Sequence, residues 1–408
     1  MSGSPTRHRW LAILGVGEEG VEGLSARART VLSRADWVIG GERHLALLGA
    51  WIPCQRTPWP SPLRDAAELI RPRRGQSVVV LASGDPFHYG VGSQLAGAFP
   101  ADEMLCIPAP SAFSLACARL GWTRQEIKTL SLCGRPISSL LRALHPGQRI
   151  MALSADATTP AAVASCLREH GFGRSRLHVL ECMGGPRERI LEGRANDFAG
   201  EDIQPLNVVA IEVHADPGAR IIPLACGLDD ALFEHDGQIT KREIRALTLS
   251  ALAPRAGELL WDIGCGSGSV SIEWLMRHDA NRAIAIDANG ERVRRAARNA
   301  LSLGTPNLLA VEGAAPEVFG DLPAPDAIFL GGGARVPSLI EASWRALRSG
   351  GRIVANAVVL ETEGALLAAQ REFGGRLCRL SVERLDLVGR YHAFRPAMAV
   401  TQWCAEKK

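Results

Sequence analysis

Apolar segments of strand length alternate with amphipathic segments of helix length along most of the chain. In the first half the apolar runs lie at residues 10–16, 78–83, 149–153, 176–182 and 206–213. Stretches with the spacing of a helix separate them, such as PAAVASCLREHGFG at residues 160–173. This alternation is typical of an α/β domain.

The second half has the same alternation and predicts seven strands. The strands are expected at 259–264, 283–287, 308–313, 326–333, 352–358, 376–385 and 397–403. Helices are expected between them at 291–304, 336–351 and 363–374. This half is therefore also predicted to be α/β.

The periodicity lapses between Ala215 and Gly237, where Gly, Pro and Asp are frequent. At about 150 residues per domain, 408 residues suggest two or three domains. We predict a first domain at 1–215, a linker at 216–236 and a second domain at 237–408.

Two helix starts are marked by polar residues. Ser111 is placed to cap a helix that carries Phe113. Thr240 and Glu243 have the spacing of a capping box ahead of the apolar stripe that begins at Ile244.

Composition excludes several classes of protein. The 47% apolar and 22% charged residues indicate a globular chain, and no apolar stretch reaches the roughly 20 residues of a membrane span. No signal peptide is evident at the N-terminus, so we expect a cytoplasmic protein. The ten cysteines form no Cys-x-x-Cys pair and the histidines no metal pattern, so we expect reduced thiols and no metal. A net charge of +3 and two tyrosines argue against nucleic acid.

The run LWDIGCGSGSVSIEW at residues 260–274 carries the clearest chemical signal. A strand leads into Gly264, Gly266 and Gly268, and Asp287 ends the next apolar run nineteen residues later, close to the roughly 20 expected of a nucleoside-binding βαβ unit. Glycines allow close backbone approach to a ligand, and the carboxylate can accept hydrogen bonds from ribose hydroxyls. The spacing is not that of a dinucleotide or Walker loop. DIGCGSG instead resembles the signature of class I S-adenosylmethionine (SAM) methyltransferases.

Further motifs resemble two known families. GVGEEG, SGDPFHYG and PAPSAFS, within residues 10–215, resemble the tetrapyrrole (corrin/porphyrin) methylase family. DGQITKREIRALTLSAL, WDIGCGSGSVSIEW, EGAAPE and FLGGG, within residues 222–405, resemble the decarboxylating precorrin methyltransferases. One departure is that Glu18 and Glu19 stand where the first family usually has Pro and Gly.

These resemblances imply a fold, a cofactor and an activity. The first domain should hold SAM between two α/β lobes, and the second should be a Rossmann-like class I methyltransferase. Together they imply a bifunctional enzyme of cobalamin biosynthesis that methylates precorrin-6B at carbon 5 (N-terminal domain) and carbon 15 (C-terminal domain). The C-terminal domain would also decarboxylate the ring C acetate, giving precorrin-8. A homo-oligomer built on the C-terminal domain is implied as well.

The implied site residues fall into two groups. SAM is expected near Gly15, Gly17, Ser83, Gly84, Asp85 and Ser111 in the first domain, and near Thr240, Gly264, Cys265, Gly266, Ser267, Gly268, Asp287, Gly313 and Ala314 in the second. Lys241 and Arg242 are candidates for binding substrate carboxylates, although ordinary exposed charge explains them equally well. Methyl transfer from a sulfonium to an enamine-like carbon mainly needs alignment, so no triad or metal is required and no catalytic residue is singled out.

Two features and the function of the whole chain each allow more than one interpretation. Arg292, Arg294, Arg295 and Arg298 form either a basic binding face or, as we favour, a solvated helix face. Cys265 is either reactive or a small residue tolerated beside the cofactor. For the whole chain, the alternative is a SAM methyltransferase for another small molecule or RNA, with a non-catalytic N-terminal binding module suggested by Glu18 and Glu19.

Overall fold

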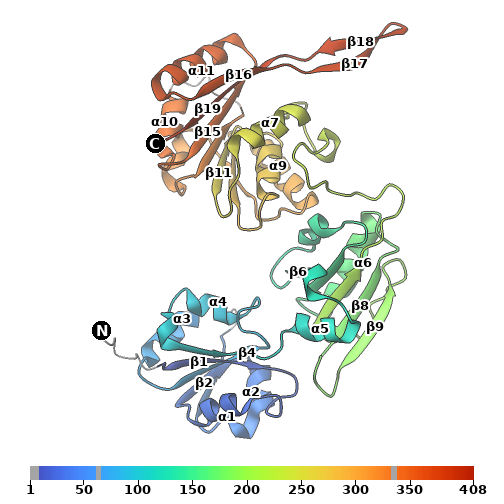
Figure 1. The fold of residues 1–408 in the computed structure, drawn as a ribbon, viewed down its shortest axis with the longest axis vertical. Helices are drawn as coiled ribbons and strands as arrows, with labels where there is room; N and C mark the ends of the chain where they lie inside the picture. Colours follow the sequence, from blue (N-terminus) through green and yellow to red (C-terminus); the bar gives the residue numbers. More distant parts are fainter. Residues whose placement is uncertain (1–8, 61–65, 332–337) are drawn as a thin grey trace. The chain divides into compact units, whose positions relative to one another are not determined.

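The computed structural model describes residues 9–60, 66–331 and 338–408 and divides the chain into two compact units. The N-terminal unit consists of Met1–Ile137 and His145–Arg220, and the C-terminal unit of Ser138–Leu144 and Ile221–Lys408. Both units are α/β, each with its own sheets and buried apolar clusters (Figure 1). None of the helices in these ranges combines the length and apolar run that a bilayer crossing requires.

The N-terminal unit begins with a parallel five-stranded sheet in the order β3-β2-β4-β1-β5. Its central strands are continuous apolar runs because both faces of the sheet are covered. On β1, Leu11 and Ile13 pack into one buried cluster and Ala12 and Leu14 into another. The strands are β1 (Leu11–Val16), β2 (Trp37–Gly40), β3 (Gln55–Pro58), β4 (Val78–Ser83) and β5 (Met104–Ile107), with helices α1 (Ala26–Ser33), α2 (Glu42–Leu48), α3 (Ala66–Ile70) and α4 (Val91–Ala96).

A second sheet of the same unit is mixed, in the order β6-β7-β10-β8-β9. Strands β6 and β7 are parallel and the other pairs antiparallel. The three predicted runs form β7, β8 and β10, whereas β6 and β9 were not predicted. The elements are β6 (Ile127–Ser131), β7 (Arg149–Leu153), β8 (Arg176–Glu181), β9 (Arg189–Arg194), β10 (Asn207–Glu212), α5 (Ala112–Leu120) and α6 (Thr159–Glu169).

The C-terminal unit has one seven-stranded sheet in the order β13-β12-β11-β14-β15-β19-β16. Strand β19 runs antiparallel to both of its neighbours, β15 and β16, and the other pairs are parallel. All seven predicted runs contribute a strand, although the last two residues of the run 326–333 and the start of the helix at 336–351 lie outside the described residues. The strands are β11 (Leu259–Ile263), β12 (Arg282–Asp287), β13 (Leu309–Glu312), β14 (Ala327–Leu330), β15 (Arg352–Ala357), β16 (Arg376–Leu380) and β19 (Val400–Glu406).

Among the described residues, five α-helices accompany this sheet. Buried clusters lie on both of its faces, one around Trp261 and Trp403 and the other around Trp274 and Phe329. The helices are α7 (Arg242–Leu252), α8 (Ser269–Leu275), α9 (Gly290–Ser302), α10 (Leu339–Ala346) and α11 (Leu360–Phe373).

The predicted strand at 376–385 is divided in the structure. Its first part is β16, and its last residues begin a separate two-stranded hairpin of β17 (Glu383–Val388) and β18 (Tyr391–Pro396). Every residue of both hairpin strands is exposed, and the hairpin extends away from the seven-stranded sheet (Figure 1). A single continuous strand was therefore a wrong prediction, because the apolar pattern of the run does not reveal which partner each part pairs with.

The two predicted helix starts have different outcomes. Ser111 caps α5 as predicted, and its hydroxyl accepts the Ser114 N–H at 3.2 Å. The capping box at Thr240 was wrong: the N-cap of α7 is Lys241, which makes no side-chain capping bond. The helix starts one residue later because the Thr240 carbonyl accepts a hydrogen bond from the buried Arg245 guanidinium.

Candidate functional site

Backbone-to-backbone packing of three loops builds the candidate site of the N-terminal unit. Strands β1 and β4 are parallel, so Val16 lies opposite Ser83 and their loops leave the sheet side by side. The Gly84 N–H donates to the Val16 carbonyl at 3.1 Å, and the Ala109 N–H to the Gly84 carbonyl at 3.0 Å. A Cβ on Gly15 would stand 1.9 Å from the Gly84 oxygen, so this junction requires glycine.

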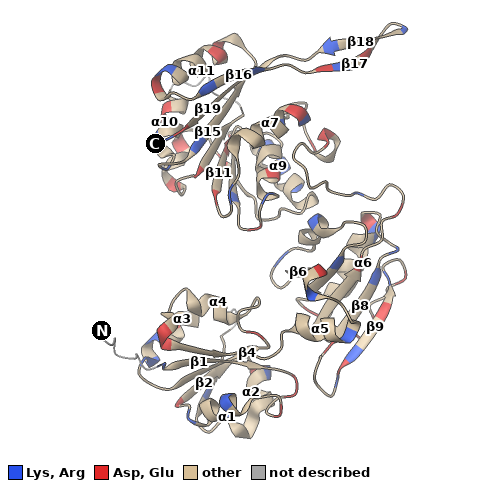
Figure 2. Cartoon of the chain, viewed as in Figure 1, with Lys and Arg blue, Asp and Glu red and all other residues tan. Residues whose placement is uncertain are grey.

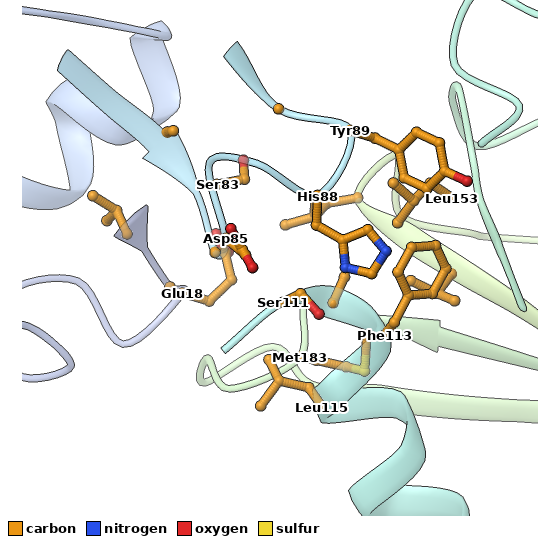
Figure 3. Close-up of a pocket in the computed structure, with 18 of the residues that line it drawn as sticks. Glu18, Ser83, Asp85, His88, Tyr89, Ser111, Phe113, Leu115, Leu153 and Met183 are labelled. Carbon is orange, nitrogen blue, oxygen red and sulfur yellow. The ribbon is translucent and has the colours of Figure 1, made fainter. Parts of the chain in front are cut away.

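A cavity of about 370 Å³ opens beside these loops. Of the six residues predicted near SAM in this unit, Gly17, Ser83, Gly84, Asp85 and Ser111 line it, whereas Gly15 packs behind them. The second lobe supplies part of the wall, including Leu153 on β7 and Met183, which follows β8 (Figure 3). The structure therefore brings two lobes of one unit around a common cavity.

Aromatic side chains that we did not single out also line this cavity. The rings of His88 and Phe113 face each other with centroids 4.7 Å apart, and Tyr89 lies beside them (Figure 3). Burial and the neighbouring Arg124 lower the pKa of His88, while Asp85 opposes the shift. The sequence contained a signal for His88 and Tyr89, since both lie within the SGDPFHYG motif.

A charged cluster at the cavity explains what Glu18 does in this chain. Its carboxylate is buried and accepts a hydrogen bond from Arg43 on α2. Arg43 also donates to the Ser83 hydroxyl at 2.8 Å, and His44 Nε2 lies 2.9 Å from the same oxygen. Burial and then Arg43 lower the pKa of His44 to about 4, so its imidazole is neutral at neutral pH. Arg43 and His44 gave no sequence signal, because only the fold brings α2 to this loop.

In the C-terminal unit, the glycine loop between β11 and α8 turns over the end of β12. The Gly264 and Cys265 N–H groups both donate to the Ile286 carbonyl, at 2.9 and 3.1 Å. Gly264, Gly266 and Gly268 have φ values of +72°, +56° and +73°, a region that favours glycine. A Cβ on Gly268 would lie 2.8 Å from the Ala296 side chain, so the loop also packs closely on α9.

Asp287 joins the parts of this site. Its carboxylate accepts the Gly266 N–H at 3.1 Å and the Asn289 N–H at 3.0 Å, and its carbonyl accepts the Gly313 N–H at 3.0 Å. Asp287 is 8% exposed. The structure thus brings the loop 264–268, Asp287 and Gly313 together at the carboxyl edge of the sheet, with Ala314 following Gly313.

Burial raises the pKa values of two ionisable side chains in the loop region, Asp262 and Cys265. Asp262, the acid of the DIGCGSG motif, is 1% exposed, and burial raises its pKa to about 6. Burial, followed by the charges of Asp262 and Asp287, raises the pKa of the Cys265 thiol. Because the nucleophilic form of cysteine is the thiolate, these surroundings favour the inert interpretation of Cys265. Ser267, whose carbonyl accepts from Asn299, is 1% exposed.

The segment that precedes α7 lies against the loop. The Gln238 carbonyl is 3.3 Å from the position that a Cβ on Gly266 would take. Thr240, Lys241 and Arg242 follow within four residues; Lys241 and Arg242 are exposed, and the Lys241 ammonium is 4.0 Å from Asp230.

The arginines of α9 are paired with acids of the same unit. Arg292 and Arg295 contact Asp236, and Arg298 contacts Glu234 and Glu291. Arg294 also pairs with Glu291. Acidic and basic residues are interspersed over both units (Figure 2). Within the described ranges, no group of three His, Cys, Asp or Glu is arranged to hold a metal ion.

Comparison with known proteins gives a class for each unit. A family model described as tetrapyrrole (corrin/porphyrin) methylases matches residues 11–199, and one described as a precorrin methyltransferase domain matches residues 231–407. The chain is therefore an enzyme of the SAM-dependent methyltransferase class.

Individual relatives narrow this class. A precorrin-6Y C(5,15)-methyltransferase (decarboxylating) of Sinorhizobium sp is 50% identical over 97% of this chain and 95% of the relative. A "probable cobalt-precorrin-6B C(15)-methyltransferase (decarboxylating)" of Pyrobaculum calidifontis is 36% identical over 43% of this chain and 95% of the relative. A cobalt-precorrin-7 C(5)-methyltransferase of Salmonella typhimurium is 32% identical over 44% of this chain and 88% of the relative. The chain belongs to the precorrin-6Y C(5,15)-methyltransferase (decarboxylating) family.

Proposed function

We propose that the chain is a bifunctional enzyme of cobalamin biosynthesis that methylates precorrin-6B at carbons 5 and 15 and removes carbon dioxide from the ring C acetate, giving precorrin-8. The observation that carries this proposal is the 50% identity to a C(5,15)-methyltransferase over 97% of the chain. The presence of a separate candidate site in each unit supports two methylations by one chain.

The chemistry requires alignment more than reactive side chains. In each methylation a nucleophilic carbon of the macrocycle attacks the sulfonium methyl, and the carbon–sulfur bond breaks to leave S-adenosylhomocysteine. In the decarboxylation the electrons of the breaking carbon–carbon bond move into the conjugated macrocycle, and a proton is then added to the acetate-derived carbon. In the C-terminal unit the glycine loop allows a donor to approach the backbone closely, and the Asp287 carboxylate beside it is suited to accepting hydrogen bonds from ribose hydroxyls.

We assign carbon 5 to the N-terminal unit and carbon 15 with decarboxylation to the C-terminal unit. Relatives named for the single activities each align with less than half of this chain. The match to a tetrapyrrole methylase model lies in the first half, and the match to a precorrin methyltransferase domain in the second. These findings support a division of the reaction between the two units.

Within the C-terminal unit, we propose that the macrocycle lies at the carboxyl edge of the sheet. Val358, Val359 and Leu360 follow β15 at this edge and are 47%, 41% and 80% exposed. An apolar macrocycle face suits such a surface. Lys241 and Arg242, exposed at the start of α7, would then bind the carboxylates of its rim.

We further propose a homo-oligomer built on the β17–β18 hairpin. The strand register places Leu385, Leu387 and Phe394 on one face, and each is at least 60% exposed. An isolated two-stranded hairpin is only marginally stable in water, so a second copy of this apolar face is the expected cover. Sedimentation should show dissociation for Phe394→Ser. Val388→Ser, on the opposite face, is the matched control, and an unchanged mass of Phe394→Ser would exclude the assignment.

A cytoplasmic location belongs to the same proposal. All ten cysteines are free in the structure, as expected for a reducing compartment.

The test of the function is the product formed from precorrin-6B and SAM by the full chain, analysed by mass spectrometry and NMR. Gly266→Val should block the C-terminal loop, and the product should retain the ring C carboxylate. Gly257→Val is the control, because Gly257 also has a positive φ but has open space around it. Asp85→Ala should instead prevent methylation at carbon 5. If Asp85→Ala abolishes decarboxylation and Gly266→Val does not, the assignment of activities is reversed.

A further inference from the structure

A single amide on α9 connects the glycine loop of the C-terminal unit to the segment that precedes α7. Asn299 is 3% exposed, and its Nδ2 donates to the Ser267 carbonyl and to the Glu234 carbonyl, both at 2.9 Å. Its Oδ1 accepts the Glu234 N–H at 2.8 Å. Both donor hydrogens and one acceptor lone pair of the amide are thus used on backbone groups of two different segments.

The segment that precedes α7, residues 227–240, is also held in place by charged side chains. The buried Arg245 guanidinium donates to Glu273 at 2.6 Å and also to the Leu228 carbonyl. Glu273 in turn accepts the Gly227 and Leu228 N–H groups, at 2.7 and 3.0 Å. The segment from Gly227 to Thr240 is therefore fixed to α7 and α8, and ion pairs of Asp236 and Glu234 fix it to α9 as well. The Asn299 side chain bonds both to this segment and to a carbonyl of the glycine loop.

This linkage places the segment where it can shape the cofactor loop. The Gln238 carbonyl lies close to Gly266, and Arg292 donates a hydrogen bond to the Gln238 side chain at 2.8 Å. A ligand held by backbone groups needs those groups to be fixed before it binds, because ordering them afterwards reduces the affinity. The Ser267 carbonyl, held by Asn299, lies in the middle of that loop.

We propose that Asn299 is a positioning residue for SAM in the C-terminal unit, setting the affinity for the methyl donor without touching it. The inference rests on the proposed function only in taking the loop 264–268 as the SAM site of this unit. It does not depend on which tetrapyrrole is methylated.

The discriminating variant is Asn299→Asp, which keeps the size of the side chain but removes both donors and sets a carboxylate against two carbonyls. Asn281→Asp is the matched control. Asn281 is 1% exposed and likewise bridges backbone groups, accepting the Gly257 N–H at 3.0 Å and donating to the Trp274 carbonyl at 3.3 Å. It precedes β12, at the opposite edge of the sheet from the glycine loop. Asn299→Ala, which adds no charge, serves if Asn299→Asp does not fold.

The measurement is the SAM concentration that gives half-maximal protection of residues 264–268 from hydrogen exchange in the full chain. We expect it to rise about tenfold in the Asn299 variant and to stay within about twofold in Asn281→Asp, at similar losses of thermal stability. KM for SAM should rise while kcat at saturating SAM is kept. Equal SAM dependence in wild type and the Asn299 variant, an equal change in both variants, or no protection of 264–268 in the wild type would each overturn the proposal. Failure of the proposed function would appear separately, as an unchanged precorrin in the presence of normal SAM binding.

Discussion

Asp262 makes the stability of the C-terminal unit depend on pH in a direction opposite to that of most carboxylates. Its Oδ2 accepts the Ser271 N–H at 3.1 Å and the Ser271 hydroxyl at 2.7 Å, while its Oδ1 has no hydrogen-bond partner in the described part of the chain. Burial raises its pKa from 3.8 to about 6, although the Ser271 bonds oppose the shift. The folded unit therefore binds a proton more readily than the unfolded chain, and Asp262 adds stability as the pH falls from above 6 toward 4.

The size of this effect follows from the two pKa values. Above pH 7 both states are ionised and the gain from protonation is absent. At pH 5 the folded carboxyl is mostly protonated and the unfolded one mostly ionised, which corresponds to about 1 kcal/mol in favour of folding. Asp262→Asn cannot take up this proton. The variant should therefore lack about 1 kcal/mol of the change in unfolding free energy that the wild type shows between pH 7.5 and pH 5.

The assay is urea unfolding at both pH values. Unfolding of the C-terminal unit is monitored by hydrogen exchange of a peptide that spans β11. Comparing each protein with itself at two pH values cancels the constant cost or gain of the substitution, and groups common to both proteins cancel as well. Asp326→Asn is the control, since that carboxylate is partly exposed and pairs with Arg348. An equal change in the unfolding free energy of wild type and Asp262→Asn between the two pH values would refute this role of Asp262.

Three further predictions concern the remaining parts of the chain. Because burial and Arg43 lower the pKa of His44 to about 4, the N-terminal unit should lose stability as the pH falls from 6.5 toward 4. In acid unfolding, His44→Gln should lose about 2 kcal/mol less unfolding free energy at pH 5 than the wild type loses. An unchanged pH profile of stability would contradict the pKa shift of His44. Asp287→Ala should weaken SAM binding in the C-terminal unit about ten- to a hundred-fold by calorimetry, as a charge-assisted bond of ~1.5–3 kcal/mol implies; unaltered affinity would exclude the role. Limited thermolysin digestion should cut first near Leu224, which is 76% exposed; early cleavage within 227–240 would show that Arg245 does not hold that segment.

Local patterns predicted most of the regular structure. The continuous apolar runs became β1 and β4 of the N-terminal unit and β11, β12, β14 and β15 of the C-terminal unit because strands covered on both faces leave a strong signal. Ser111 was identified as a cap because a cap bond joins residues three apart. Thr240 failed as a cap because a contact from Arg245 competed for its carbonyl. Strand β9 was not predicted because its residues are mostly exposed, so that no apolar periodicity marks it in the sequence.

The site was predictable only as far as its motifs extend. The loops around Gly84 and Gly266 carry glycines whose backbone roles are local, and the structure shows positive φ at both. Arg43, by contrast, reaches the cavity because α2 packs beside β4, a relation between residues forty apart that periodicity does not encode. The contacts of Asn299 could not be predicted from the sequence either, because its partners lie 32 and 65 residues away.

The buried pair of Arg245 and Glu273 limits how the sequence of this enzyme can change over time. Both side chains are fully buried. Replacing Arg245 leaves the Glu273 carboxylate in the interior without its counter-charge, a loss of typically about 3–5 kcal/mol, and replacing Glu273 leaves Arg245 paired with the more exposed Asp230. Replacing both by apolar residues is often tolerated in proteins, but that outcome is reached only through one of the two destabilised intermediates. The two positions should therefore behave as a single inherited unit: descendants of this sequence should keep the pair, and where one member is lost a second, compensating substitution should follow.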